Sequence, residues 1–233
     1  MRADFLRSLL KRLLNAFFPK RCPFCGSVIF PQEDCCAGCL PRLPRADRSK
    51  ACYRCGKQRC TCGAVPLLTM TCSSFYYEEL ACFAVQRLKF GHRPGAALAL
   101  GGFMAETVRE TGTAWDIVVP IPMTIKKRRH RGYNQAELLC RVLSERLGIP
   151  TVSALCKIRE TKAQHTLDAA ARASNLSDAY MADAAIVQGK RVLLCDDVLT
   201  TGATLKEGAK ALFQAGALEV GAVTLCSVER NRD

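Results

Sequence analysis

Short apolar runs alternate with amphipathic stretches over the carboxyl-terminal two thirds of the chain. Three runs have the length and apolar character of buried strands: 116–119, 191–195 and 220–225. Three stretches carry apolar residues at helical spacing: 95–110, 134–147 and 204–214. A shorter ordered stretch begins at Phe83 and ends at Phe90. Strands separated by helices predict an α/β domain with a parallel sheet covered on both faces.

The amino-terminal part of the chain has a different pattern. In the first 18 residues, Arg7, Lys11 and Arg12 interrupt an apolar stripe, which indicates an amphipathic helix and not a signal peptide. This helix would pack on the chain's own domains or a partner, or lie on an anionic membrane surface. No stretch reaches the ~18 apolar residues of a membrane-spanning helix. We therefore expect an amphipathic helix over 1–20, a cysteine-rich module over 21–68 and the α/β domain over 70–229.

Composition and charge narrow the class of protein. An apolar content of 49% with 24% charged residues is typical of a folded chain and excludes a disordered one. Lys and Arg number 34 against 21 Asp and Glu, so the formal net charge is +13. This excess favours anionic partners, namely phosphate groups, nucleic acid or lipid head groups, without choosing among them.

Cysteine is concentrated near the amino terminus. Of 15 cysteines, 11 lie between Cys22 and Cys82. An odd number without a secretory signal argues against a disulfide framework and for thiolate metal ligation in a reducing cytoplasm. The remaining four lie in apolar surroundings and are interpreted as small buried side chains: Cys140, Cys156, Cys195 and Cys226.

Eight of the cysteines form four closely spaced pairs. In order, the pairs are Cys22 and Cys25, Cys36 and Cys39, Cys52 and Cys55, and Cys60 and Cys62. Two such pairs supply the four thiolates that a structural zinc ion takes, so we expect two zinc sites with no open position for catalysis. The pairs can combine sequentially or interleaved, and Cys35 is a possible substitute ligand. Glycines in or after the turns provide tight backbone: Gly26, Gly38 and Gly56.

The segment after the predicted strand at 191–195 has the chemistry of a phosphate site. Its residues are Asp196, Asp197, Val198, Leu199, Thr200, Thr201, Gly202, Ala203 and Thr204. Hydroxyls and backbone N–H groups would gather at the positive end of a helix dipole, and Gly202 lets the backbone approach a phosphate. The two carboxylates can accept hydrogen bonds from sugar hydroxyls. A phosphate site next to acceptors for sugar hydroxyls suggests a ribose 5-phosphate as the ligand. Alternatively, the threonines only cap a helix. No lysine follows the glycine, which excludes an ATPase P-loop.

This segment resembles the phosphoribosyl diphosphate motif of type I phosphoribosyltransferases. The chain is most similar to the ComF family, from Cys22 to about Ser227, and the resemblance rests on further motifs. These are Leu88-Lys89-Phe90, Val119-Pro120-Ile121-Pro122, Arg131-Gly132-Tyr133-Asn134-Gln135, and Gln164 and Leu167 with Arg172 and Asn175. The resemblance implies a type I phosphoribosyltransferase-like fold behind a double zinc ribbon, with Mg²⁺ accompanying phosphoribosyl diphosphate. Some members of the family are needed for the uptake of transforming DNA.

The resemblance also implies roles for a basic segment. Residues 126–131 read Lys, Lys, Arg, Arg, His and Arg, and Arg131 with Asn134 and Gln135 would lie near the diphosphate. Lys89 could reach the same group. Alternatively, the basic run is a solvated turn or contacts nucleic-acid phosphates. The polar stretch 161–175 corresponds to a segment that closes over the site in the family, or is a plain surface helix with His165 on its surface.

Two functions follow as hypotheses. In the first, the protein is a phosphoribosyltransferase in which Asp196, Asp197 and Arg131 are the catalytic residues and the threonine loop binds substrate, serving DNA uptake or nucleotide metabolism. In the second, it is a non-catalytic zinc-containing protein that binds single-stranded DNA for the DNA-uptake machinery. Substrate-dependent diphosphate release would support the first, and a steep salt dependence of DNA affinity the second. The sequence shows no recognisable hood for an acceptor base.

Overall fold

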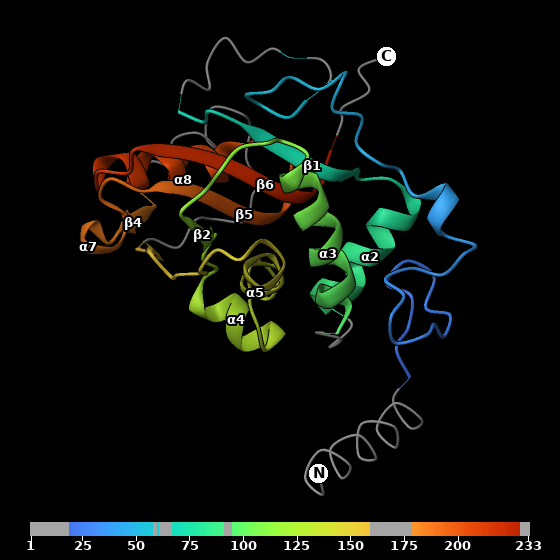
Figure 1. Ribbon diagram of the computed structural model, residues 1–233. Coiled ribbons are helices and arrows are strands. Elements are labelled where there is room, and N and C mark those ends of the chain that lie inside the picture. Colours follow the sequence, from blue (N-terminus) through green and yellow to red (C-terminus); the bar gives the residue numbers. More distant parts are fainter. Residues whose placement is uncertain (1–18, 58–59, 61–66, 91–94, 159–178, 229–233) are drawn as a thin grey trace, which may run out of the picture.

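The computed structural model describes residues 19–57, 60, 67–90, 95–158 and 179–228 (Figure 1). Residues 1–18, which make up most of the expected amphipathic helix, lie outside these ranges, as do Cys62 and the stretch 161–175. Within the described ranges, no helix is both long and apolar enough to cross a membrane.

The centre of the protein is a parallel sheet of four strands. In sequence order they are β1 (Thr71–Tyr76), β2 (Ile117–Pro120), β5 (Arg191–Leu199) and β6 (Glu219–Ser227). Their spatial order is β1-β6-β5-β2, and every neighbouring pair is parallel. The predicted α/β class with a parallel sheet is therefore confirmed, with β1 as a strand that the hydrophobic pattern did not indicate.

Helices connect the strands. They are α2 (Glu79–Phe90), α3 (Ala96–Arg109), α4 (Ile125–Arg131), α5 (Gln135–Leu147), α7 (Ala184–Val187) and α8 (Ala203–Gln214). A separate antiparallel pair joins β3 (Leu155–Lys157) to β4 (Tyr180–Ala182), and a 3₁₀ turn, η1, covers Leu40–Arg42. The short ordered stretch expected at Phe83 is thus part of a full helix, and the basic segment 126–131 lies in a helix and not in a turn.

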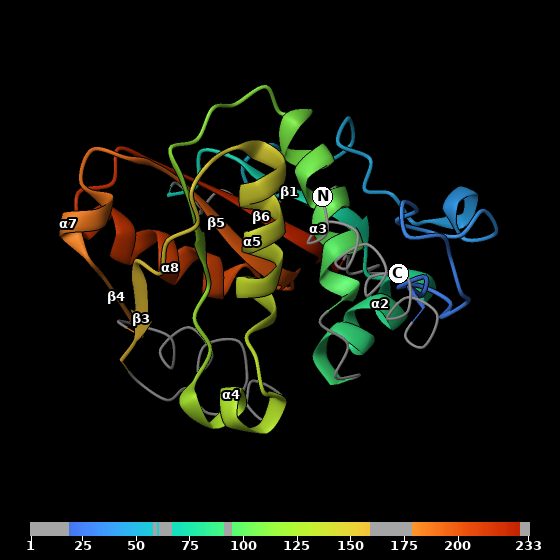
Figure 2. The same cartoon turned by 60° about the horizontal axis from the view of Figure 1, so that its bottom comes forward.

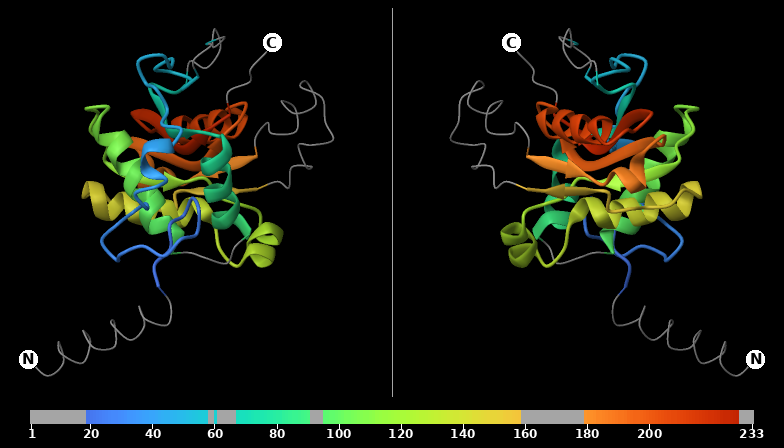
Figure 3. Two further views of the ribbon diagram at one scale, coloured as in Figure 1. Left: turned by 90° about the vertical axis from the view of Figure 1, so that its right-hand side faces the viewer. Right: turned by 90° about the vertical axis from the view of Figure 1, so that its left-hand side faces the viewer.

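The two faces of the sheet carry different layers, as Figures 1 and 3 show. Helices α3 and α5 cover one face and α8 covers the other, together with β3 and β4. Because alternate strand residues point to opposite faces, Leu193 and Val223 join the core under α3 and α5. Their neighbours Leu194 and Ala222 join the core under α8. Both faces of the sheet are thus buried.

The first cysteine-rich turn packs into the same core as α3. The rings of Phe24, Phe75 and Phe103 meet edge to face with centroids 5.3–5.9 Å apart. Cys22 and Cys39 are buried in that core, at 1% and 4% exposure. Aromatic triads of this geometry add packing energy beyond their buried area. The first cysteine pairs are therefore anchored on the α/β domain and not tethered to it by a free linker.

Candidate functional site

Strand β5 carries the two carboxylates that the sequence placed after it. The strand was expected to end at Cys195, but it continues to Leu199, with Asp196 opposite Thr224 and Val198 opposite Cys226 of β6. The expectation was wrong because it ended the strand where the apolar run ended, whereas β6 pairs with the polar residues as well. Asp196 and Asp197 consequently lie inside the ladder, where adjacent side chains point to opposite faces.

Asp197 forms an ion pair with α2. Its Oδ2 lies 3.0 Å from Nζ of Lys89, in the last turn of that helix. Both side chains are largely buried, at 14% and 22% exposure, so the pair is shielded from solvent screening. The structure thus brings together two predicted site residues that are more than 100 positions apart in the chain.

Asp196 occupies a different environment. It is half-buried and accepts a hydrogen bond of 2.8 Å from the backbone N–H of Asp197. Burial, and secondly the charge of Asp197, raise the pKa of Asp196 to about 7, although Lys89 and Lys127 oppose the shift. Burial followed by the charge of Asp196 also raises the pKa of Tyr180 in β4. A carboxyl poised near neutrality can both donate to and accept from a sugar hydroxyl.

The raised pKa of Asp196 predicts a pH-dependent stability. Between the ordinary pKa of 3.8 and the native value of about 7, the folded state binds the additional proton. The contribution of this carboxyl to the free energy of unfolding is therefore present at low pH and is lost as pH rises through about 7. We expect Asp196→Asn to gain a few kcal/mol relative to wild type between pH 4 and pH 7, measured by urea unfolding. A difference that stays constant with pH would contradict this account.

The threonine loop opens α8 in the predicted way. Gly202 is the residue before the helix and has φ +81°, a left-handed conformation that favours glycine. The first helical hydrogen bond runs from the N–H of Lys206 to the carbonyl of Gly202, so the N–H groups of Thr204 and Leu205 precede it. The Thr201 hydroxyl accepts a 3.4 Å bond from the N–H of Ala203. Together with the exposed Thr200, this loop presents donors at the positive end of a helix dipole.

The segment after α4 attaches the basic helix to α2. The Tyr133 hydroxyl donates a 2.7 Å hydrogen bond to the carbonyl of Leu88, and the Arg131 guanidinium lies 5.0 Å from the ring centroid of Phe90. Tyr133 was quoted in the family motif but given no role by the sequence. Its contact holds the carboxyl end of α2, and hence Lys89, beside the segment that follows α4.

The two polar residues that follow have unequal freedom to bind a ligand. Asn134 caps α5, because its Oδ1 accepts from the N–H of Ala136 at 3.1 Å and its Nδ2 donates to the carbonyl of Ile121 at 3.0 Å. Gln135 is 2% exposed, and its Oε1 accepts a 3.2 Å bond from Arg131. Its Nε2 has no hydrogen-bond partner among the described residues. The side chain of Asn134 is thus used by the fold, whereas Gln135 retains a free donor.

Helix α4 presents a cationic surface. Residues 126–130 are all exposed, and none of the residues of α4 is buried. Arg128 forms a bidentate ion pair with Glu137 of α5 at 3.0 and 3.1 Å, which fixes the helix against its neighbour. In Figure 2, α4 lies at one end of the molecule, apart from α7 and α8.

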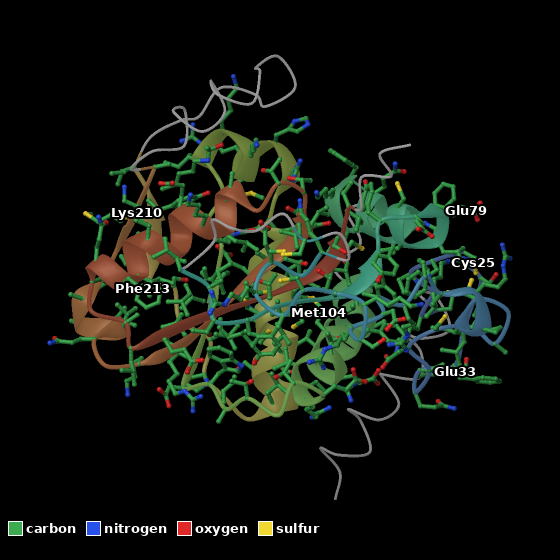
Figure 4. All side chains as sticks on the ribbon, turned by 90° about the horizontal axis from the view of Figure 1, so that it is seen from above. Cys25, Glu33, Glu79, Met104, Lys210 and Phe213 are labelled. Atoms are coloured by element: carbon green, nitrogen blue, oxygen red, sulfur yellow. The ribbon has the colours of Figure 1, made fainter. Side chains whose placement is uncertain are left out.

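The first four paired cysteines converge. The sulfur atoms of Cys22, Cys25, Cys36 and Cys39 all lie within 4.8 Å of one another, and Cys25 and Cys36 are 3.5 Å apart. A tetrahedral zinc ion with Zn–S bonds of about 2.3 Å requires sulfur separations of about 3.8 Å, so the set fits zinc. Cys52, Cys55 and Cys60 form a second group of the same kind. The groups combine neighbouring pairs, which favours sequential over interleaved pairing. Figure 4 shows Cys25 in the amino-terminal segment, far from Lys210 and Phe213 of α8.

Position distinguishes the four grouped cysteines from Cys35 better than protonation does, because burial raises the pKa of the Cys39 thiol as well. The nearby Ser27 hydroxyl, 3.3 Å away, lowers the pKa of the Cys25 thiol to about 6, which favours the metal-binding thiolate. Burial, and secondly the charge of Cys22, raise the pKa of Cys35 to about 12. Cys35 also lies 4.0 Å from Cys22 without joining the group of four. It is therefore a neighbouring thiol and not the first choice of ligand.

The later cysteines are as expected with one exception. Cys140, Cys195 and Cys226 are buried, whereas Cys156 is exposed. The interpretation of Cys156 as a buried side chain was wrong, because β3 belongs to a separate two-stranded pair and Leu155 is the only residue of β3 that is buried.

Comparison with known proteins agrees with this arrangement. Residues 89–233 match the phosphoribosyl transferase domain. The chain is 33% identical to DNA utilization protein YhgH of Salmonella typhimurium over 211 residues, covering 88% of this chain and 89% of that protein. Competence protein F of Haemophilus influenzae is 29% identical, covering 85% and 81%, and Competence protein ComFC of Bacillus subtilis is 26% identical, covering 85% and 86%.

A parallel sheet with paired carboxylates and a glycine-containing loop before α8 defines a protein of the type I phosphoribosyltransferase class. Within that class, the chain belongs to the ComF family, whose members it matches over 85–88% of its length. The resemblance stated from the sequence motifs is confirmed.

Proposed function

We propose that this protein binds phosphoribosyl diphosphate with Mg²⁺ at the carboxyl end of β5. One observation carries the proposal: the acidic pair, the amino end of α8 and the Lys89 cation meet at one end of one strand. Ligands of open α/β sheets bind outside the carboxyl ends of strands. A sugar carrying phosphates at two positions matches a site that offers carboxylates between two groups of donors.

Each group has a distinct task in this proposal. The loop formed by residues 200–204 holds the 5-phosphate with backbone N–H groups and hydroxyls. Asp196 and Asp197 accept hydrogen bonds from the ribose hydroxyls. Lys89 and Arg131 face the diphosphate, and Gln135 supplies its free amide N–H. Because Lys89 already neutralises Asp197, the acidic pair does not repel the arriving diphosphate.

Asp196 and Asp197 alone do not supply enough ligands for Mg²⁺, so they fit an ion that is also bound by the phosphates of the ligand. No third carboxylate or histidine of the described residues joins Asp196 and Asp197 in a group that could hold a metal. Mg²⁺ binds through one or two carboxylates plus substrate phosphates and keeps several waters, which is what this site offers. When bound, the ion would shield the charge of the departing diphosphate.

We propose that the binding serves phosphoribosyl transfer. Diphosphate leaves the anomeric carbon of ribose, a nucleophile attacks there, and the protein contributes position and electrostatic stabilisation without a covalent intermediate. The zinc-loaded protein, incubated with phosphoribosyl diphosphate, Mg²⁺ and candidate acceptors, should release diphosphate faster when the right acceptor is present. Binding of phosphoribosyl diphosphate without release under any acceptor would favour a ligand-binding role.

A second candidate function has its own observation. The exposed cations of α4 form a surface suited to phosphates of single-stranded DNA, and the names of the relatives refer to DNA utilization and competence. In this case the protein would act with DNA-uptake proteins. The double variant Lys126→Gln/Arg129→Gln should then weaken DNA binding and lower the slope of affinity against salt by about one to two. An unchanged slope would remove α4 from the DNA interface.

We propose structural zinc at both cysteine groups, with Cys62 as the fourth ligand of the second group. We also propose that the chain is divided into three parts: an amphipathic helix at 1–20, a double zinc ribbon-like module at 21–68 and the phosphoribosyltransferase-like domain at 70–229. Thiolate ligation is stable where thiols stay reduced, which supports a cytoplasmic location. Contact of residues 1–20 with a membrane surface is the alternative to their packing on protein.

A further inference from the structure

Helix α2 lies between the first cysteine group and the phosphoribosyl site. On one side, Nη1 of Arg87 donates to the carbonyl of Pro23 at 3.2 Å and to the carbonyl of Cys22 at 3.5 Å. The turn that follows wraps closely around the same guanidinium, because a Cβ on Gly26 would lie 3.0 Å from Nη2 of Arg87. The backbone of the Cys22–Cys25 turn is therefore fitted to one side chain of α2.

On its other side, α2 reaches the phosphoribosyl site. Lys89 follows Arg87 by two residues, which turns it about 200° around the helix axis. Its ion pair with Asp197 lies on that side, at 3.0 Å. The helix between them cannot adjust freely, because Val85 and Leu88 are fully buried in the core that also contains Cys22. A packed helix of this kind would pass a shift of the cysteine turn on to Lys89.

We propose that metal occupancy of Cys22, Cys25, Cys36 and Cys39 is coupled through Arg87 and α2 to ligand binding at Asp197. The metal fixes the turn whose carbonyls hold Arg87, and this holds Lys89 in place for the anionic ligand. The coupling rests on the proposed function, because it takes phosphoribosyl diphosphate as the ligand. Coupling of two binding equilibria is reciprocal, so the ligand also stabilises the metal.

Arg87→Ala tests the link without removing a metal ligand or a site residue. We expect the zinc-loaded variant to bind phosphoribosyl diphosphate with Mg²⁺ about tenfold more weakly than wild type in calorimetric titration. Arg21→Ala is the matched control, because Nη1 of Arg21 donates to the carbonyl of Gly26 at 3.1 Å but Arg21 belongs to the cysteine turn and not to α2. Its affinity should equal that of wild type. Equal affinity of Arg87→Ala and wild type would overturn the coupling.

The reciprocal measurement uses the wild-type chain and does not depend on how the variant folds. Phosphoribosyl diphosphate with Mg²⁺ should slow the release of zinc to a chromogenic chelator about tenfold, and Lys89→Gln should abolish the slowing. Release from wild type that does not respond to the ligand, in a protein that binds it, contradicts the proposal.

Failure of the coupling and failure of the proposed function give different results. Hydrogen exchange of the backbone amides at 86–90 needs no ligand. It should be about fivefold faster in Arg87→Ala than in wild type and unchanged in Arg21→Ala. If wild type does not bind phosphoribosyl diphosphate but this exchange changes as expected, the proposed function is wrong and the structural link from the cysteine turn to α2 is supported. Equal exchange in all three proteins would contradict the link between the cysteine turn and α2, whether or not the ligand binds.

Discussion

Cys39→Ser is expected to release zinc from the first cysteine group and to lower the free energy of unfolding by about 4 kcal/mol or more. Cys39 is buried in the core that contains Phe24 and Phe75, so a metal at this group would join the cysteine turns to that core. The free energy of binding a structural zinc ion is in large part free energy of folding, which makes the loss larger than that of one buried thiol. Metal content and urea unfolding measure the two effects.

Cys35→Ser is the control for this variant. Cys35 lies 4.0 Å from Cys22 but outside the group of four, so it should stay a thiol while the four others bind metal. We expect full zinc content and a loss of stability within about 1 kcal/mol. If instead Cys35→Ser loses the metal and Cys39→Ser keeps it, the ligand set is wrong.

Gly202→Val is expected to weaken the binding of phosphoribosyl diphosphate by at least about 100-fold. Gly202 has φ +81°, which a β-branched residue adopts only with strain, and its backbone forms the start of α8. If the loop holds the 5-phosphate as proposed, displacing it would remove two or more hydrogen bonds to a charged group, each worth about 1.5–3 kcal/mol. Calorimetric titration with phosphoribosyl diphosphate and Mg²⁺ measures the loss.

Gly189→Val separates this effect from general strain. Gly189 also has a positive φ, +69°, and no atoms lie where its Cβ would be, but it is in the turn before β5, at the opposite end of the strand. Both variants should lose stability to a similar degree, and only Gly202→Val should lose affinity. Equal loss of affinity in the two would show that the loop at Gly202 has no special role.

The hydrophobic pattern predicted the elements that bury one continuous apolar surface. The cores of β2, β5 and β6, and the helices α3, α5 and α8, were found within a few residues of their observed bounds. Strand β1 was missed because its centre is polar. Ser73 pairs with Thr224 at 2.7 Å and Ser74 with Thr107 at 3.0 Å, so hydroxyls are buried only because partners far along the chain satisfy them.

Helix α2 was predicted only as a short ordered stretch and α4 was not predicted as a helix, because neither has apolar residues that mark one buried face. Helix α2 exposes Phe83 and Phe90, at 54% and 59%, so its apolar residues do not mark one face. Helix α4 buries nothing and is defined by its ends, where the Thr124 hydroxyl accepts from the N–H of Lys127 and Gly132 adopts φ +81°. Such a helix is predicted by its capping residues and not by periodicity.

The sequence predicted which residues belong to the candidate site but not how they contact one another. The motif indicated Asp196, Asp197 and the threonine loop, since they are neighbours in sequence. That Lys89 forms an ion pair with Asp197, and that Tyr133 holds the carbonyl of Leu88, depends on how α2 docks. No local pattern reports such long-range contacts.

Calorimetric titration of the zinc-loaded protein with phosphoribosyl diphosphate and Mg²⁺, beside Asp196→Asn/Asp197→Asn, tests the central claim most directly. The double variant keeps the size of both side chains but removes the charge that Lys89 neutralises and the acceptors for the ribose hydroxyls. We expect wild type to bind and the double variant to lose that binding. A wild-type protein that does not bind the compound, or a double variant that binds it equally well, would contradict the assignment of this strand end as a phosphoribosyl diphosphate site.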